Sequence, residues 1–293
     1  MEDHRICSMQ NVSIKGKEGI LLQNIELNIN RSNLFTIIAR DGSGSSILKV
    51  LAGLKSTEEG TIEYNFDVKK PSGVSKHVQY VPDDIVCYSN MKVKEFVQGL
   101  LYTDKGQDAV EEAIRLCDLF NLDMEEQLLD MTFEHNRLLA MIQAIAMQPD
   151  LLLLDMPYDL LSDRVYGMLL KELVRLRMKG TAIIIVADAY NKVVIPCDRY
   201  IFLKDGEIYA TYNGKQLPHP AKVITLEGGV LKYMIHSKMQ VLYRTKKRCG
   251  ILYREQDVSE LIARIYLSGC HNFSVNELSM EEEIYEDYER WMP

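Results

Sequence analysis

The sequence predicts an α/β fold in which helices alternate with the strands of a mixed sheet. An apolar run of strand length at 34–39 is followed by a glycine-rich loop at 41–44 and then by a helical pattern. Two further apolar runs, at 151–154 and 182–186, lie on either side of an amphipathic helical pattern at 165–176. Strands that alternate with helices in this way pair in parallel, so these segments form the core of the predicted sheet.

The remaining segments of the first part complete this fold. The N-terminal stretch predicts two strands, at 6–14 and 20–29, because its apolar residues keep mostly to alternate positions. Over about 92–147 apolar residues recur at helical spacing, which predicts a helical insert between strands. Runs at 200–203 and 207–211 are separated by an Asp-Gly turn and predict a β-hairpin.

A second, smaller α/β domain follows a proline-containing linker. The linker is Pro218-His219-Pro220, where each proline restricts its own backbone and that of the residue before it. We therefore expect one domain over 1–217 and a C-terminal accessory domain over 221–293. Asp257 and Ser279 are the expected helix N-caps in this domain. The patterns predict strands at 223–226, 250–253 and 272–278. They predict helices at 257–267 and 280–291.

Composition excludes several classes of protein. The chain has 293 residues, 47% hydrophobic and 26% charged, which is typical of a globular protein. No window approaches the roughly 18 consecutive apolar residues of a membrane-spanning helix, and the N-terminus is polar and charged, so we expect neither a span nor a secretory signal. The six cysteines contain no C-x-x-C pair, which favours reduced thiols over a zinc site or a disulfide framework.

The charge balance argues against nucleic acid as a partner. The formal net charge of the chain is -8, whereas broad nucleic-acid binding depends on neutralising phosphates with Lys and Arg. One local basic cluster is interpreted as a solvated surface: Arg244, Lys246, Lys247 and Arg248.

Three motifs occur in the order and spacing of a known family. Residues 39–54 contain the glycine-rich loop and end in Leu-Ala-Gly-Leu, residues 148–157 contain Leu-Leu-Leu-Leu-Asp, and residues 197–208 contain the Asp-Gly hairpin. Together they resemble the Walker A loop, the Walker B strand and the closing hairpin of the ATP-binding subunits of ABC transporters. The resemblance covers most of 1–216 and implies a P-loop NTPase fold of the ABC type, with a mixed sheet core and a helical insert.

The C-terminal part resembles a narrower group. Residues 258–265 as a helix, then 273–275 and 278–285, are similar to the tail of the ATPases that serve ABC-2-type exporters. This resemblance implies an exporter-like subtype.

The resemblance also assigns the nucleotide site. In a P-loop, backbone N–H groups and a helix N-terminus face the phosphates, a lysine neutralises them, and a Ser or Thr hydroxyl holds magnesium. The lysine position here is Ser45, which supplies no cation, and Ala39 replaces the first glycine. The vestigial nucleotide positions are Gly42, Ser43, Gly44, Ser45, Ser46, Ile47 and Asp83, and the vestigial magnesium positions are Ser46 and Asp155. Outside the resemblance, the glycines could form a plain turn and Asp155 could end a strand.

The catalytic positions of the family are altered as well. Met156 stands where the family has the glutamate that polarises the attacking water, and a thioether is no general base. Asp188 stands at the switch-histidine position. Phe133 and Glu134 replace the two glycines of the signature motif, where a ring and a carboxylate oppose the approach of a phosphate. No adenine-stacking aromatic follows Ser13, since Ile14 and Lys15 stand there.

These positions predict a degenerate ABC cassette whose ATP hydrolysis is lost or greatly reduced. We expect weak or absent binding of ATP and Mg²⁺, a membrane permease and a second cassette as partners in a homo- or heterodimer, and a cytoplasmic location on the inner face of the cell membrane. One alternative is a slow but genuine ATPase that uses Ser46, Asp155 and an acid such as Asp159 or Asp188. A further alternative is a free-standing scaffold.

Overall fold

The computed structural model describes residues 4–16, 19–66, 71–84, 90–192, 197–227, 239–255 and 257–292. The chain divides into two compact units, residues 1–214 (unit 1) and residues 215–293 (unit 2). Among the described residues no disulfide joins the cysteines, whose side chains are buried: Cys7, Cys117, Cys197, Cys249 and Cys270. Cys87 lies outside the described residues.

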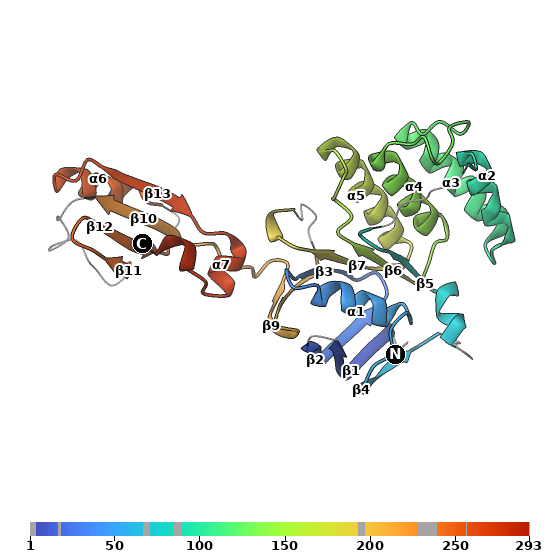
Figure 1. Ribbon diagram of the computed structural model, residues 1–293, viewed down its shortest axis with the longest axis horizontal. Coiled ribbons are helices and arrows are strands. Elements are labelled where there is room, and N and C mark those ends of the chain that lie inside the picture. The colour runs from blue at the N-terminus through green and yellow to red at the C-terminus, as the bar shows by residue number, and fades with distance from the viewer. Residues whose placement is uncertain are drawn as a thin grey trace. The chain divides into compact units, whose positions relative to one another are not determined.

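A six-stranded sheet forms the centre of unit 1, in the order β5-β6-β7-β3-β8-β9. The strands from β5 to β8 pair in parallel, whereas β9 returns antiparallel beside β8, so the sheet is mixed as the sequence predicts. The three central strands are buried along their whole length, because helices cover both faces of the sheet (Figure 1). In chain order the strands are β3 (Leu34–Ile38), β5 (Val78–Val81), β6 (Leu151–Asp155), β7 (Ala182–Ala187), β8 (Arg199–Lys204) and β9 (Glu207–Asn213).

A second, three-stranded sheet of unit 1 has the order β2-β1-β4. Helix α1 (Ser43–Leu51) lies between the two sheets, and its Ile47, Leu48 and Leu51 pack into a hydrophobic core that both sheets share (Figure 1). This core fixes the start of α1, and with it the glycine-rich loop, against the central strands. The strands of the second sheet are β1 (Arg5–Gly16), β2 (Gly19–Asn30) and β4 (Glu59–Tyr64).

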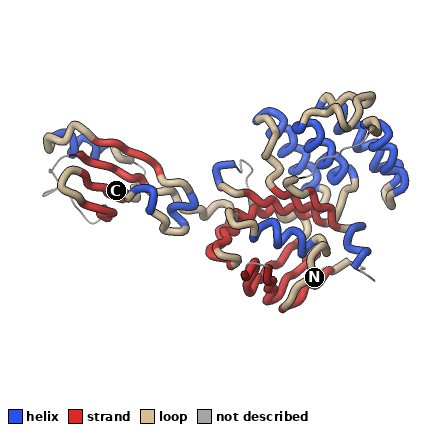
Figure 2. The backbone as a smooth tube through the Cα atoms, viewed as in Figure 1, coloured by secondary structure: helices blue, strands red, loops and turns tan. Residues whose placement is uncertain are grey.

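Helices make up most of the segment from residue 92 to residue 147, as predicted, and Figure 2 shows them grouped beside the sheet. Here α3 and α4 pack against each other, and an ion pair of 2.5 Å between Arg115 and Glu172 joins α3 to α5. In the parts of the chain that the structure describes, no helix combines the length and apolarity that crossing a membrane requires. The helical segments of unit 1 after α1 are η1 (Pro71–Lys76), α2 (Val93–Gln98), η2 (Gly99–Tyr102), α3 (Gly106–Phe120), α4 (Phe133–Ala146), α5 (Asp163–Met178) and η3 (Tyr190–Lys192).

Unit 2 is a four-stranded antiparallel sheet in the order β11-β12-β10-β13, and Leu261 and Ile265 of α6 pack into a hydrophobic cluster with its central strands. Ser279 caps α7 through a capping box, as predicted. The prediction for Asp257 is wrong: α6 begins at Ser259, and Asp257 instead accepts a hydrogen bond from the Ser259 N–H at 2.8 Å. The elements are β10 (Lys222–Glu227), β11 (Met239–Arg244), β12 (Arg248–Tyr253), α6 (Ser259–Leu267), β13 (Phe273–Glu277), α7 (Met280–Ile284) and η5 (Glu289–Trp291).

Candidate functional site

The loop between β3 and α1 has the backbone geometry of a phosphate-binding loop. Gly42 adopts a left-handed φ of 77° and forms the N-cap of α1. A Cβ on Gly44 would lie 2.8 Å from Cγ1 of Val186 on β7, so glycine lets the helix start close to the sheet. The first N–H groups of α1 lie at the positive end of the helix dipole, where an anion is stabilised. The backbone part of a phosphate cradle is therefore present.

Ser45, at the expected lysine position, forms a hydrogen bond to another side chain of the protein. Its hydroxyl donates to Oδ1 of Asp155 at 3.0 Å, and the Tyr80 hydroxyl donates to Oδ2 of the same carboxylate at 3.2 Å. Burial raises the pKa of Asp155, while the hydrogen bonds from Ser45 and Tyr80 partly offset that effect. Both oxygens of the Asp155 carboxylate thus accept hydrogen bonds from protein donors, and Ser45 brings no positive charge to the loop.

The other vestigial positions differ in what they offer a nucleotide. Ser43 is buried, and its hydroxyl donates to Asp41 at 2.5 Å. Ile47 packs its side chain into the hydrophobic core, so only its backbone is suited to a phosphate. Asp83 is exposed just beyond the end of β5, where its negative charge raises the pKa of Asp155. Ser46 is buried at the start of α1.

The side chains of Ser46 and Asp155 suit a magnesium ion, whereas the loop lacks a cation for the phosphates that would accompany it. The Ser46 hydroxyl and the Asp155 carboxylate are the oxygen ligands that Mg²⁺ prefers. No group of three or more His, Cys, Asp or Glu side chains is placed to hold a metal within the described ranges. A magnesium ion here would therefore need the phosphates as further ligands, and those phosphates lack the lysine that neutralises them.

A buried arginine that the sequence did not single out holds this region together. Arg137 on α4 is 1% exposed, and its guanidinium donates to the carbonyl oxygens of Pro82, of Asp155 at 2.5 Å and of Met156 at 3.2 Å. Burial lowers the pKa of Arg137, and the surrounding carboxylates, Asp83 first, oppose that shift. Arg137 thus connects the helical part of unit 1 to the ends of β5 and β6.

Hydrogen bonds hold Met156 and Asp188, the residues at the two expected catalytic positions, in place. Met156 follows β6 directly in a left-handed conformation with φ 44°, and its N–H donates to the Val186 carbonyl at 3.0 Å. The Asp188 carboxylate accepts hydrogen bonds from the Tyr158 hydroxyl at 2.6 Å and from Lys192 Nζ at 3.0 Å. Burial raises the pKa of Asp188, but these two donors outweigh it, so the pKa lies below its ordinary value. Asp188 is consequently a fixed anion rather than a proton carrier near neutral pH.

The Tyr158–Asp188 bond predicts a pH-dependent loss of stability in Tyr158→Phe. The pKa of Asp188 is lower in the folded protein than in the unfolded chain. Ionised Asp188 therefore stabilises the fold at pH values above the ordinary aspartate pKa. This stabilisation is lost as pH falls through the lowered folded-state pKa. We expect the variant to lose about 1 kcal/mol of unfolding free energy at pH 7, since the bond is partly solvent-exposed. The difference from the wild type should shrink as pH falls from the ordinary aspartate pKa of about 4 toward the lowered folded-state value, because the unfolded chain then binds a proton that folded Asp188 does not. Urea unfolding followed by circular dichroism measures both quantities.

Tyr166→Phe is the matched control for this prediction. The Tyr166 ring lies 6.2 Å from that of Tyr158, and the Tyr166 hydroxyl is buried with no hydrogen-bond partner among the described residues. Its removal should be neutral or slightly stabilising at every pH. A constant difference for Tyr158→Phe from pH 7 to pH 3, or the same loss in both variants, would contradict the assignment of Asp188 as the titrating group.

The segment at the expected signature position begins a helix at Phe133. The Thr132 hydroxyl caps α4 by accepting from the His135 N–H at 3.1 Å. Phe133 is 62% exposed on the first turn. The Glu134 carboxylate accepts from both the N–H and the hydroxyl of Ser162, at 2.7 and 2.8 Å, and these bonds lower its pKa. The first turn of α4 therefore presents a bulky ring and an ionised carboxylate.

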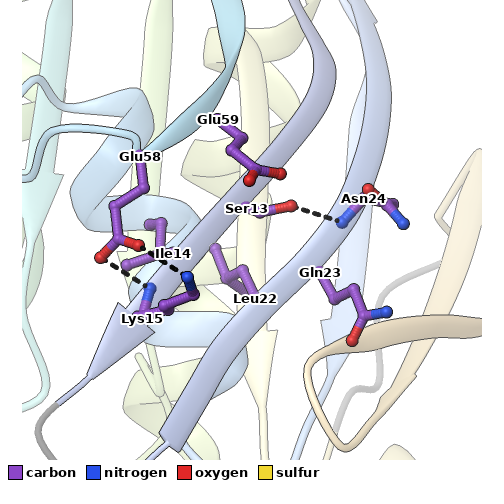
Figure 3. Close-up of a pocket in the computed structure, with 8 residues that line it drawn as sticks. All are labelled: Ser13, Ile14, Lys15, Leu22, Gln23, Asn24, Glu58 and Glu59. Atoms are coloured by element: carbon purple, nitrogen blue, oxygen red, sulfur yellow. Dashed lines mark hydrogen bonds and ion pairs between the residues drawn. The ribbon is translucent and has the colours of Figure 1, made fainter.

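A small pocket opens between β1, β2 and β4, next to the place where the family has its adenine-stacking aromatic (Figure 3). It has a volume of about 180 Å³, and none of its eight lining residues is aromatic. Figure 3 shows Lys15 beside Glu58, with an ion pair of 3.9 Å, and Asn24 donating its N–H to the Ser13 hydroxyl at 3.1 Å. The pocket therefore offers polar groups but no ring for a base to stack on.

Comparisons with known proteins find similarity to ATP-binding proteins of transport systems. The family model described as ABC transporter matches residues 22–159. The chain is similar to the D-allose import ATP-binding protein AlsA of Escherichia coli (strain K12), with 22% identity over 63% of this chain and 39% of that protein. It is also similar to the high-affinity branched-chain amino acid transport ATP-binding protein BraG of Pseudomonas aeruginosa, with 26% identity over 69% of this chain and 90% of that protein. The chain spans less than half the length of the sugar-import relatives that it matches.

Solved structures show the same fold. The chain is similar to a structure described as the ATP binding subunit of an ABC transporter, with a TM-score of 0.66, 17% identity, and coverage of 71% of this chain and 90% of that chain. The mixed sheet, the loop before α1 and the helical insert of unit 1 are thus those of a P-loop cassette, as the sequence predicts. Unit 1 therefore has the P-loop cassette fold, and residues 22–159 within it match the ABC transporter family model.

Proposed function

We propose that the chain is a degenerate, non-hydrolysing ATP-binding-cassette subunit of an ABC transporter, which acts in assembly or regulation rather than as the motor. The observation that carries this proposal is the 3.0 Å hydrogen bond from Ser45 to Asp155 at the position where the family needs a lysine. Domains of this kind bind ATP, usually with Mg²⁺; here the missing lysine weakens or abolishes that binding. Hydrolysis additionally lacks a base, because Met156 replaces the glutamate.

The slow-ATPase alternative needs a repositioned acid, and the structure gives the two candidates other partners. Asp188 is bonded to Tyr158 and Lys192, and Asp159 lies 3.9 Å from Lys192 Nζ. A base must have a free lone pair directed at the attacking water. Either carboxylate would first have to leave Lys192, which makes turnover through these residues a weaker proposal.

The partners follow from the architecture of the family. Two cassettes face each other there, and each site combines the Walker motifs of one subunit with the signature of the other. A homodimer of this chain would have no complete site, because Ser45 and Met156 alter one half and Phe133 and Glu134 alter the other. We therefore favour a heterodimer with an intact cassette, seated on a permease at the cytoplasmic face of the cell membrane.

The direction of transport is a separate part of the proposal. The exporter-like subtype rests on the C-terminal tail, over residues 258–285. The D-allose relative is named for import, and an importer subunit is the alternative that it favours. The cassette core serves both directions, so the permease decides between them.

The test is Asp155→Asn within the complex purified from the native cells through a tag on the full chain. We expect a permease and an intact cassette to co-purify, and the variant to keep the ATP turnover of the complex within about twofold of the wild type. The control is the matching Asp→Asn change in the intact cassette, which should abolish turnover.

Two results would contradict the proposal. Loss of turnover in Asp155→Asn would establish a genuine ATPase site in this chain. A purified complex without any membrane protein would favour the free-standing scaffold.

A further inference from the structure

One end of unit 2 collects cations and exposed apolar side chains from segments that are far apart in the sequence. The register pairs Arg244 with Cys249, Cys249 with Leu226, and Leu226 with Phe273, so the turn between β11 and β12 lies at the same end of the sheet as the start of β13. Helix α6 ends at this end too, because residues 268–272 return directly from α6 to β13. We name residues 244–248 and 266–271 together the basic end of unit 2.

The basic side chains of the turn between β11 and β12 are exposed to solvent. The Thr245 hydroxyl accepts from the N–H groups of Lys247 and Arg248, at 3.3 and 2.9 Å, which fixes a tight turn with its side chains exposed. Arg248 pairs with Glu227 at 2.8 Å. Within residues 197–227, 239–255 and 257–292, no acidic side chain forms an ion pair with Lys246 or Lys247. These two ammonium groups are available to an external anion.

The end of α6 adds an apolar component beside them. Leu267 is 84% exposed and Tyr266 is 59% exposed. The Tyr266 ring contacts the His271 ring at 4.6 Å, which holds it next to the start of β13. The Cys270 thiol lies 3.6 Å from the Glu227 carbonyl oxygen, so the end of α6 adjoins the strand whose Glu227 pairs with Arg248. Cations and exposed apolar groups therefore lie at the same end of the sheet of unit 2.

We propose that the basic end of unit 2 binds the surface of an anionic lipid bilayer directly. Lysines attract anionic headgroups, while an exposed leucine and a tyrosine enter the interface between headgroups and acyl chains. A nucleic-acid backbone would use the cations but would leave Leu267 without an apolar partner. This surface is independent of the state of the nucleotide site.

The experiment is co-sedimentation of the full chain with vesicles of phosphatidylcholine alone and of phosphatidylcholine mixed with phosphatidylglycerol. We expect binding to the mixed vesicles only, because each Lys or Arg contributes through the surface potential. Lys246→Gln with Lys247→Gln should weaken the partition coefficient by roughly 30-fold, from two lysine contributions. Salt at about 1 M should release the protein, since it shortens the screening length to about 3 Å.

The matched control is Lys105→Gln with Lys171→Gln, which removes the same charge from exposed positions of unit 1. It should leave binding unchanged, whereas Leu267→Ser should weaken it without altering its salt dependence. Equal binding to both kinds of vesicle, or equal losses in the two double variants, would overturn the proposal. Tighter binding to a DNA duplex than to the mixed vesicles, lost in Lys246→Gln with Lys247→Gln, would also overturn it.

Discussion

Ser45→Lys is expected to tighten the binding of MgATP by about 100-fold and to leave phosphate release at background. The side chain at this position already lies at the start of α1, within 3.0 Å of the Asp155 carboxylate. A lysine there would bring a cation to the phosphates, and hydrogen bonds to charged groups of this kind are worth about 1.5–3 kcal/mol. Release stays at background because Met156 supplies no base. Calorimetry and a phosphate-release assay on the same preparation measure both effects.

Ser45→Ala is the control for the lysine variant. It removes the hydrogen bond to Asp155 without adding a cation, so it should not tighten MgATP binding. Equal tightening in both variants would show that freeing Asp155, rather than adding charge, governs affinity. No change in Ser45→Lys would contradict the assignment of this loop as a phosphate cradle.

Arg137→Met is expected to cost unit 1 about 3–5 kcal/mol of stability. The methionine roughly keeps the apolar stem of the side chain but leaves buried carbonyl oxygens of Pro82, Asp155 and Met156 without their donor. Leaving buried polar groups without their charged hydrogen-bond partner lowers the free energy of unfolding by about this amount. Native-state hydrogen exchange of peptides from β6 and α4 measures the loss within unit 1.

Arg164→Met is the matched control, because Arg164 is exposed on the first turn of α5. It should change stability by less than about 0.5 kcal/mol. Arg137→Lys should fall between the two, since one ammonium cannot replace a planar guanidinium at all three carbonyls. Protection in β6 and α4 that is unchanged in Arg137→Met would contradict the structural role of this arginine.

Periodicity and turn chemistry were enough to predict the fold class. The runs that became β3, β6 and β7 are apolar along their whole length, as strands covered on both faces require. The strands β4 and β11 were missed because most of their residues are exposed or half-buried, so no clear apolar alternation marks them. The strand β5 has only four residues, too few for a reliable pattern.

The sequence could give the positions of the expected site residues but not the contacts that their side chains make. The order of the motifs located Ser45 and Asp155, whereas their hydrogen bond joins residues 110 positions apart and depends on the parallel packing of β3 and β6 around β7. The sequence did not predict a buried Arg137. This residue stands between polar residues and an apolar helical run, where an arginine is normally solvated. Only the fold turns its guanidinium toward buried carbonyls.

The central claim is that this cassette does not turn over ATP, and one measurement tests it directly. Purified protein is titrated with ATP and Mg²⁺ in a calorimeter, and phosphate release is followed in the same preparation. Our account predicts weak or no binding heat and no release above background, because Ser45 and Met156 remove the cation and the base. Magnesium-dependent phosphate release that Asp155→Asn abolishes would contradict it.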